Sequence, residues 1–176
     1  MKHVLSISTL GAALLVTGFA TATDAEAASR RVVRPNAAGG TSATATVVRQ
    51  GPNGGGVIRG RTVATDSQGN ATSASGGVMR GPNGGTATRA GTNERNADGS
   101  VTHQSGVSAS GSQGSVQSSG SASRDATGNV TQSRSTTATS AATGNSVQSS
   151  SSYDSSTGLT RSATCYNASG AVIACR

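Results

Sequence analysis

Two cysteines near the C-terminal end are the residues with the clearest potential for chemistry. Cys165 and Cys175 flank the segment YNASGAVIA, which is centred on Gly170. A turn at Asn167 to Gly170 would bring the two sulfur atoms together across an antiparallel strand pair, and paired cysteines are typical of exported chains. We therefore predict a disulfide that staples a C-terminal hairpin as a cap. The spacing and the lack of a nearby histidine do not suit a redox or metal-binding pair.

Arginine is the second residue type with chemical potential, because its guanidinium group suits phosphate and carboxylate. The chain has a formal net charge of +7, and its lysine, Lys2, lies at the N-terminus. Suitable partners are anionic polymers such as extracellular DNA, lipopolysaccharide or acidic polysaccharide. The alternative is that arginine keeps a self-associating β surface soluble and blunts its edges. The candidate anion-binding residues are Arg30, Arg31, Arg34, Arg59 and Arg61.

The remaining polar residues do not form a catalytic, cofactor-binding or metal-binding pattern. A chain without lysine after its second residue has neither a P-loop nor a Ser-x-x-Lys nucleophile, and no G-x-S-x-G elbow occurs. His103 is expected in mid-strand as a polar surface residue. Asp66, Asn96 and Asp125 recur in turns, where one carboxylate per turn is too few for calcium. We therefore expect a non-enzymatic protein without a cofactor or a small-molecule substrate.

The N-terminal residues predict export. A short basic start precedes the apolar run from Val4 to Phe19, and Ala25-Glu26-Ala27 is an A-x-A cleavage signature. A membrane-spanning helix needs roughly 20 apolar residues, so residues 1–27 are interpreted as a secretory signal peptide. No transmembrane segment is expected in the mature chain. The predicted location is the periplasm, the cell surface or the extracellular space.

The composition argues against an ordinary globular core. Aromatic residues make up 2% of the chain, tryptophan is absent, and 25 residues are glycine. Ordering the backbone of one residue costs about 1 to 2 kcal/mol, and the few valines here return little by burial. Two possibilities remain: disorder, or a repetitive structure that satisfies its backbone through neighbouring units.

The spacing of glycines favours the repetitive structure. Two series with intervals of 29 or 30 residues interleave at about half that distance, and Asn or Asp often stands two or three residues before the glycine. Such residues form tight turns, and the Ser-, Thr- and Val-rich segments between them suit strands. The predicted turn glycines are Gly54, Gly69, Gly84, Gly99, Gly114, Gly128, Gly144, Gly158 and Gly170.

This periodicity predicts an all-β repeat array of strand-turn units of about 15 residues, paired into a 30-residue double repeat. An antiparallel meander and a two-sheeted solenoid both fit, and a largely disordered chain is the alternative. The repeats are expected over residues 39–164. A basic, flexible segment over 28–38 precedes them, and the hairpin with its disulfide occupies 165–176.

The turn pattern, the Ser/Thr/Gln/Val strands and the ending CYNASGAVIACR resemble a group of uncharacterised, exported, Gly/Ser/Thr-rich repeat proteins of proteobacteria. The pattern is more distantly similar to curlin subunits, which build extracellular fibres from strand-turn-strand repeats. The sequence thus leads to two hypotheses. One is a structural, self-associating protein of the cell surface, periplasm or matrix, and the other is a binding module for anionic polymers.

Overall fold

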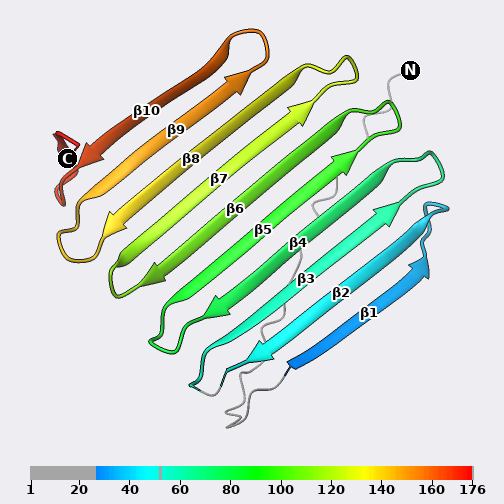
Figure 1. The fold of residues 1–176 in the computed structure, drawn as a ribbon, viewed down its shortest axis with the longest axis horizontal. Helices are drawn as coiled ribbons and strands as arrows, with labels where there is room; N and C mark the ends of the chain where they lie inside the picture. The colour runs from blue at the N-terminus through cyan, green and yellow to red at the C-terminus, as the bar shows by residue number, and fades with distance from the viewer. Residues whose placement is uncertain (1–26, 52, 176) are drawn as a thin grey trace.

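The computed structural model describes residues 27–51 and 53–175, so the predicted signal peptide lies almost wholly outside the described residues. These residues form one open antiparallel sheet in which each strand pairs with the next along the chain (Figure 1). The strands are β1 (Ala27–Pro35), β2 (Thr41–Gln50), β3 (Gly56–Thr65), β4 (Ala71–Arg80), β5 (Thr86–Arg95), β6 (Val101–Gly111), β7 (Gly114–Arg124), β8 (Val130–Ser140), β9 (Ser146–Asp154), β10 (Gly158–Tyr166) and β11 (Val172–Ile173).

The turns are closed by hydrogen bonds within five-residue segments. In the turn after β3, Oδ1 of Asp66 accepts hydrogen bonds from the backbone N–H of Gln68 at 2.8 Å and of Asn70 at 2.9 Å. Gly69 supplies the positive φ of 86° that this turn requires. Because the side chain and the glycine lie three residues apart in sequence, each turn is specified locally, and the strands between turns follow.

Turns of the same kind lie next to each other on the side of the sheet where the strand ends meet. The N–H of Ala97 donates to Oδ1 of Asn70 at 2.8 Å, and the N–H of Ser67 donates to the carbonyl of Ala38 at 3.0 Å. In a meander every second turn lies at the same ends of the strands, so the 30-residue period places equivalent turns in contact. This period therefore measures one pair of antiparallel strands with its two turns.

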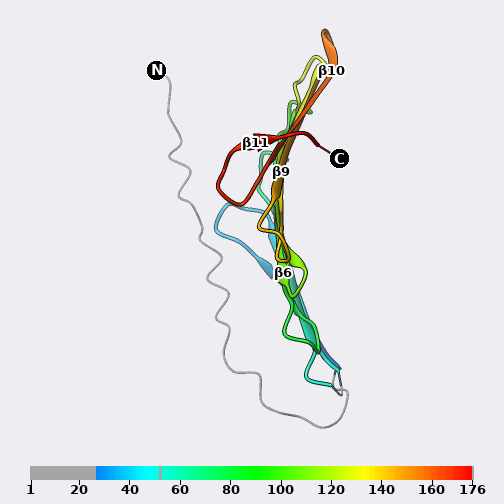
Figure 2. The ribbon, with the colours of Figure 1, turned by 90° about the vertical axis from the view of Figure 1, so that its left-hand side faces the viewer.

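The sheet is a single layer, as the edge-on view shows (Figure 2). Among the described residues, no side chain, apolar or polar, is buried. The chain accordingly adopts the meander and not the two-sheeted solenoid, in which inward-facing side chains would be covered. Both alternatives predicted the same turns, and the sequence offers too few large apolar residues to fill a space between two sheets.

The N-terminal basic segment differs from the expectation. Residues 28–38, predicted to be flexible, form β1 and part of the turn that follows it, and β1 pairs with β2 from Ala27↔Arg49 to Pro35↔Thr41. The physical reason is the turn at Asn36, whose Oδ1 accepts from the N–H groups of Ala38 and Gly40 at 3.0 and 3.1 Å. This is the same turn that the repeats use, so the segment begins the meander.

The C-terminal hairpin leaves the plane of the sheet (Figure 2). Strand β11 pairs only with Cys165 and Tyr166 of β10, so the predicted cap covers only the end of the last long strand. Consequently, in the described part of the chain, the outer edge of β10 from Gly158 to Thr164 has no strand partner. The outer edge of β1 is open in the same way.

Candidate functional site

The candidate site is a whole face of the sheet, and the strand register defines which residues share it. Residues directly opposite each other in an antiparallel pair point to the same side, and successive residues of a strand alternate between sides. Following the pairs from Arg31↔Ala45 through Ala45↔Arg61 to Arg61↔Ser75 assigns every strand residue to one face. We call the face that contains Arg61 the arginine face and the opposite one the hydroxyl face.

Nine of the twelve described arginines lie on the arginine face, and all nine are exposed. They come from seven of the strands, so the charge is spread across the sheet. They are Arg31, Arg49, Arg59, Arg61, Arg89, Arg95, Arg124, Arg134 and Arg161.

No described acidic residue shares this face. Glu94 and Asp154 belong to the hydroxyl face, and Asp66, Asp98 and Asp125 lie in turns. Each charge on the arginine face therefore adds to the others without an opposing carboxylate. A surface with this distribution attracts anions through its summed field as well as through individual contacts.

The structure divides the five arginines predicted from the sequence. Arg31, Arg59 and Arg61 share the arginine face, whereas Arg30 and Arg34 point to the hydroxyl face because they alternate with Arg31 along β1. The sequence reasoning also missed six members of the face. Arg49 lies between Arg34 and Arg59 in the sequence, and the other five follow Arg61. Only the register shows that all six share one side of the sheet with Arg61.

The arginine face also carries most of the exposed large apolar side chains. Seven of the nine in the described residues lie there, with Met79 51% and Leu159 55% exposed. They are Val33, Met79, Val107, Val116, Tyr153, Leu159 and Ile173. Charge and apolar surface therefore occur on the same side, which makes this face amphipathic.

Part of this apolar surface forms a continuous row, which we call the apolar stripe. Its members are opposite one another from strand to strand across β3 to β11, near one end of the strands. They are Val57, Met79, Ala87, Ala109, Val116, Ala138, Val147, Cys165 and Ile173. Beside the C-terminal hairpin, its last members line a hollow of about 990 Å³.

The hydroxyl face has the opposite character. From β6 to β10 its positions are Ser, Thr or Gln, except Gly106, Asp154, Gly158 and Tyr166. Neighbouring strands are joined through hydroxyl pairs, as in Ser123 with Thr131 at 2.7 Å. Four such pairs lie on the β6 to β10 half of this face, the other three being Ser121 with Ser133, Ser150 with Ser162 and Ser152 with Thr160. This half of the face holds no basic residue.

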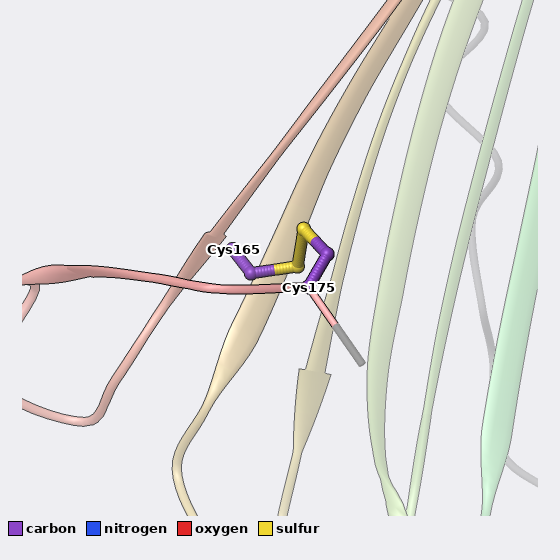
Figure 3. Close-up of a disulfide and its surroundings, with 2 residues drawn as sticks. All are labelled: Cys165 and Cys175. Carbon is purple, nitrogen blue, oxygen red and sulfur yellow. A yellow bond between two sulfur atoms is a disulfide. The ribbon is translucent and has the colours of Figure 1, made fainter.

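The disulfide lies where β10 ends and joins Cys165 to Cys175, with a Cα–Cα distance of 5.3 Å (Figure 3). The turn between them begins at Asn167, whose Oδ1 accepts from the N–H groups of Ser169 at 3.1 Å and of Ala171 at 2.8 Å. The predicted pairing and hairpin turn are thus both present. The bond closes the loop at the end of the apolar stripe.

The nine predicted turn glycines all have positive φ, between 68° and 145°. Gly114 and Gly158 begin strands, and the other seven lie in the connections. Gly114 has a second constraint, because a Cβ atom there would lie 2.0 Å from the carbonyl oxygen of Thr139. These residues shape the sheet and offer no reactive group.

Turn carboxylates are held in their charged form by the turn itself. Hydrogen bonds from the side chains of Thr127 and Asn129, and from their backbone N–H groups, lower the pKa of Asp125 to about 2. The pKa of Asp66 is also lowered, first by the side chain of Asn70. Hydrogen bonds to a carboxylate favour its ionised form, so these residues act as turn acceptors.

Other chemistry is sparse in the described part of the chain. Nδ1 of His103 lies 2.7 Å from Oδ1 of Asn93 on the neighbouring strand. Among residues 27–51 and 53–175, no three His, Cys, Asp or Glu side chains gather into a group that could hold a metal ion. The same residues include no helix with the length and apolar character needed to cross a bilayer.

Comparison with protein-family models, with curated proteins and with solved structures finds no match to this chain.

Proposed function

We propose that this protein is an exported, non-enzymatic structural component that associates with further copies of itself at the cell surface, in the periplasm or in a matrix. The observation that carries the proposal is the single-layer sheet, in which no described residue is buried and the outer edges of β1 and β10 have no strand partner among residues 27–51 and 53–175. An unpaired strand edge presents a row of N–H and C=O groups to which another strand can be added. Association would supply the burial that one copy lacks.

The edges also show partial protection against uncontrolled growth. The exposed edge of β1 carries Arg30, Arg31 and Arg34 and ends at Pro35, and charged residues and proline are devices that blunt an edge. The C-terminal hairpin occupies the last two residues of β10. Growth through these edges is therefore expected to depend on salt and on concentration.

The test uses the exported chain at increasing concentration and ionic strength, followed by sedimentation velocity and fibre diffraction. Association with a reflection near 4.7 Å, the spacing between strands, supports the proposal. Asn36 donates to Gly40, and hydrogen-bonded pairs alternate along an antiparallel ladder, so the N–H of Val33 faces outward. Val33→Pro should therefore block addition at this edge, and Val33→Ala is the matched control. A wild-type protein that stays monomeric throughout would contradict the proposal.

A second function, binding of an anionic polymer or surface, is favoured by the nine exposed arginines that share one face without a carboxylate. Phosphate and carboxylate groups are the natural partners of such a surface. Binding should weaken steeply as salt increases, because exposed charges are screened over about 8 to 10 Å at moderate ionic strength. Titration with an acidic polysaccharide at several salt concentrations measures this dependence, and salt-independent binding would contradict it.

A further inference from the structure

We infer that the partner of the arginine face is an anionic lipid surface, on which arginines bind headgroup phosphates and the apolar stripe inserts between lipids. This inference rests on the second function proposed above, anion binding by the arginine face, and it names the partner. It follows from the coincidence of two chemistries on one side of the sheet. A soluble polyanion offers charge alone, whereas a lipid surface offers phosphate and hydrocarbon together.

The apolar residues decide between these partners. Val107, Val116 and Leu159 are 40%, 39% and 55% exposed, and DNA or a polysaccharide would leave much of this apolar surface in water. Large apolar side chains are rare in this chain, and aromatic residues make up 2% of it. Seven of the nine most exposed nevertheless share the face of the nine arginines. Exposed apolar area gathered on one side marks an interaction surface.

The arrangement of charge and apolar rows suits an interface of limited depth. Val57 of the apolar stripe and Arg59 stand two residues apart on β3, which is roughly 6.6 Å along a strand. Amphipathic elements lie about 5 to 10 Å deep at the boundary between headgroups and acyl chains. With this face on the membrane, the stripe and the neighbouring arginines start at the same depth, and the long arginine side chains let the guanidinium groups reach the phosphates.

A second copy of the chain is a poor partner for this face. Two arginine faces would bring nine positive charges against nine. The hydroxyl face offers no compensation, because it carries Arg30, Arg34 and Arg80 against two carboxylates, Glu94 and Asp154. Self-association through strand edges leaves the arginine face free, so both proposals can hold for one molecule.

The experiment compares two triple variants that lose the same charge from opposite faces. Arg31→Gln, Arg59→Gln and Arg61→Gln change the arginine face, and Arg30→Gln, Arg34→Gln and Arg80→Gln change the hydroxyl face. Each exported protein is sedimented with vesicles of phosphatidylglycerol and phosphatidylcholine, and with phosphatidylcholine alone. Taking about fivefold per arginine near an anionic surface, the first triple should lower partitioning roughly 100-fold. The second triple should lower it much less.

A fluorescence measurement keeps the test valid if a triple variant fails to fold. The chain has no tryptophan, so a single introduced one reports its own surroundings. Val107→Trp places the reporter on the arginine face, and Val48→Trp places it on the hydroxyl face, where Val48 is 36% exposed. Anionic vesicles should shift the emission of the first variant to shorter wavelength and leave that of the second unchanged.

The outcomes separate the lipid inference from the wider anion-binding function. Equal loss of binding in both triples, equal emission shifts, or no preference for phosphatidylglycerol overturns the inference. If vesicles are not bound but an acidic polysaccharide or DNA is, and this binding needs the arginine-face triple, the lipid inference fails and anion binding stands. If neither vesicles nor polymers are bound, both proposals fail.

Discussion

Removal of the disulfide should release the C-terminal hairpin without unfolding the sheet. The change is the double variant Cys165→Ser and Cys175→Ser, which removes a bond that spans a sequence separation of 10 residues. In the chain-entropy description, closing a loop of this length stabilises by about 2.7 kcal/mol at 25 °C. That value corresponds to roughly 100-fold in the equilibrium between the attached and released hairpin.

Little else holds the hairpin in place. Strand β11 makes two residue pairs with β10, and the turn adds the hydrogen bonds of Asn167. Each such hydrogen bond contributes about 0.5 to 1.5 kcal/mol net, and the two residues of β11, Val172 and Ile173, remain exposed. The loss of about 2.7 kcal/mol is therefore comparable with the whole remaining stability of this hairpin, whereas β1 to β10 keep all their pairs.

Limited proteolysis with an enzyme that cuts after tyrosine measures the release. Tyr166 lies at the base of the hairpin and pairs with Val172, so cleavage there requires the hairpin to open. Tyr153 lies in β9 between two paired strands and serves as the internal reference. Cleavage after Tyr166 should accelerate by up to roughly 100-fold when opening is at equilibrium, and cleavage after Tyr153 should not change.

Two further measurements decide the case. The chain has two cysteines in all, so reduction of the wild type should reproduce the variant, and reductant should not change the variant further. The released hairpin also opens the rest of the edge of β10, so self-association should increase. Two free thiols in the native protein, or equal cleavage rates after Tyr166 in the oxidised and variant proteins, would refute the reasoning.

Two other predictions concern the turns and the strand glycines. The pKa of Asp125 is lowered to about 2 from the ordinary 3.8, so its turn contribution is complete above pH 3.8 and is lost as pH falls towards 2. Thermal melts across this range should show the loss, and Asp125→Asn should reduce it, while the other turn aspartates with a lowered pKa keep their part. Gly77→Ala would bring a Cβ within 2.8 Å of the carbonyl oxygen of Ile58, whereas at Gly60 the nearest atom is 3.9 Å away. Urea unfolding should show Gly77→Ala destabilised by about 1 to 3 kcal/mol and Gly60→Ala stabilised by about 0.5 to 1 kcal/mol; equal effects would contradict the geometry.

The turns could be predicted from the sequence because each is determined by residues within a five-residue segment. The pairing of an acceptor such as Asp66 with a glycine such as Gly69 has a direct physical meaning, and the glycine series therefore located the strand ends. The choice between meander and solenoid could not be made in the same way. Both place equivalent turns 30 residues apart, and they differ only in which strands pair.

The face could not be predicted because both sides of the strands are rich in small polar residues, which hides the alternation. Clustering in sequence joins Arg30 and Arg34 to Arg31, although Arg31 points to the opposite side of the sheet from these two. The face on which a residue lies depends on whether it stands an odd or an even number of positions from the turn before its strand. A reader of the sequence alone would need every strand register before Arg61 and Arg134 could be placed together.

The strand register is nevertheless reflected in whether the arginine residue numbers are odd or even. From β1 to β5 the arginine-face members have odd residue numbers. The interval from Gly99 to Gly128 is 29 residues instead of 30, and within it the arginine face changes from odd-numbered to even-numbered residues. Between β6 and β7 an odd-numbered residue pairs with an even-numbered one, as in Val101↔Arg124. The same happens again between β8 and β9, as in Thr131↔Asp154. Among the arginine-face members, only Arg124 and Arg134, in the two strands between these changes, have even numbers, and Arg161 returns to an odd one.

The arginines of β7, β8 and β10, Arg124, Arg134 and Arg161, thus follow the side of the sheet and not the numbering of the chain. A solubilising role for charge would be met equally by arginines on either face, since both are exposed to solvent. It gives no reason for the positions to change parity where the register does. A role that needs charge on one side gives that reason, and the exposed apolar side chains gathered on the same side point to a partner that contacts this face as a unit.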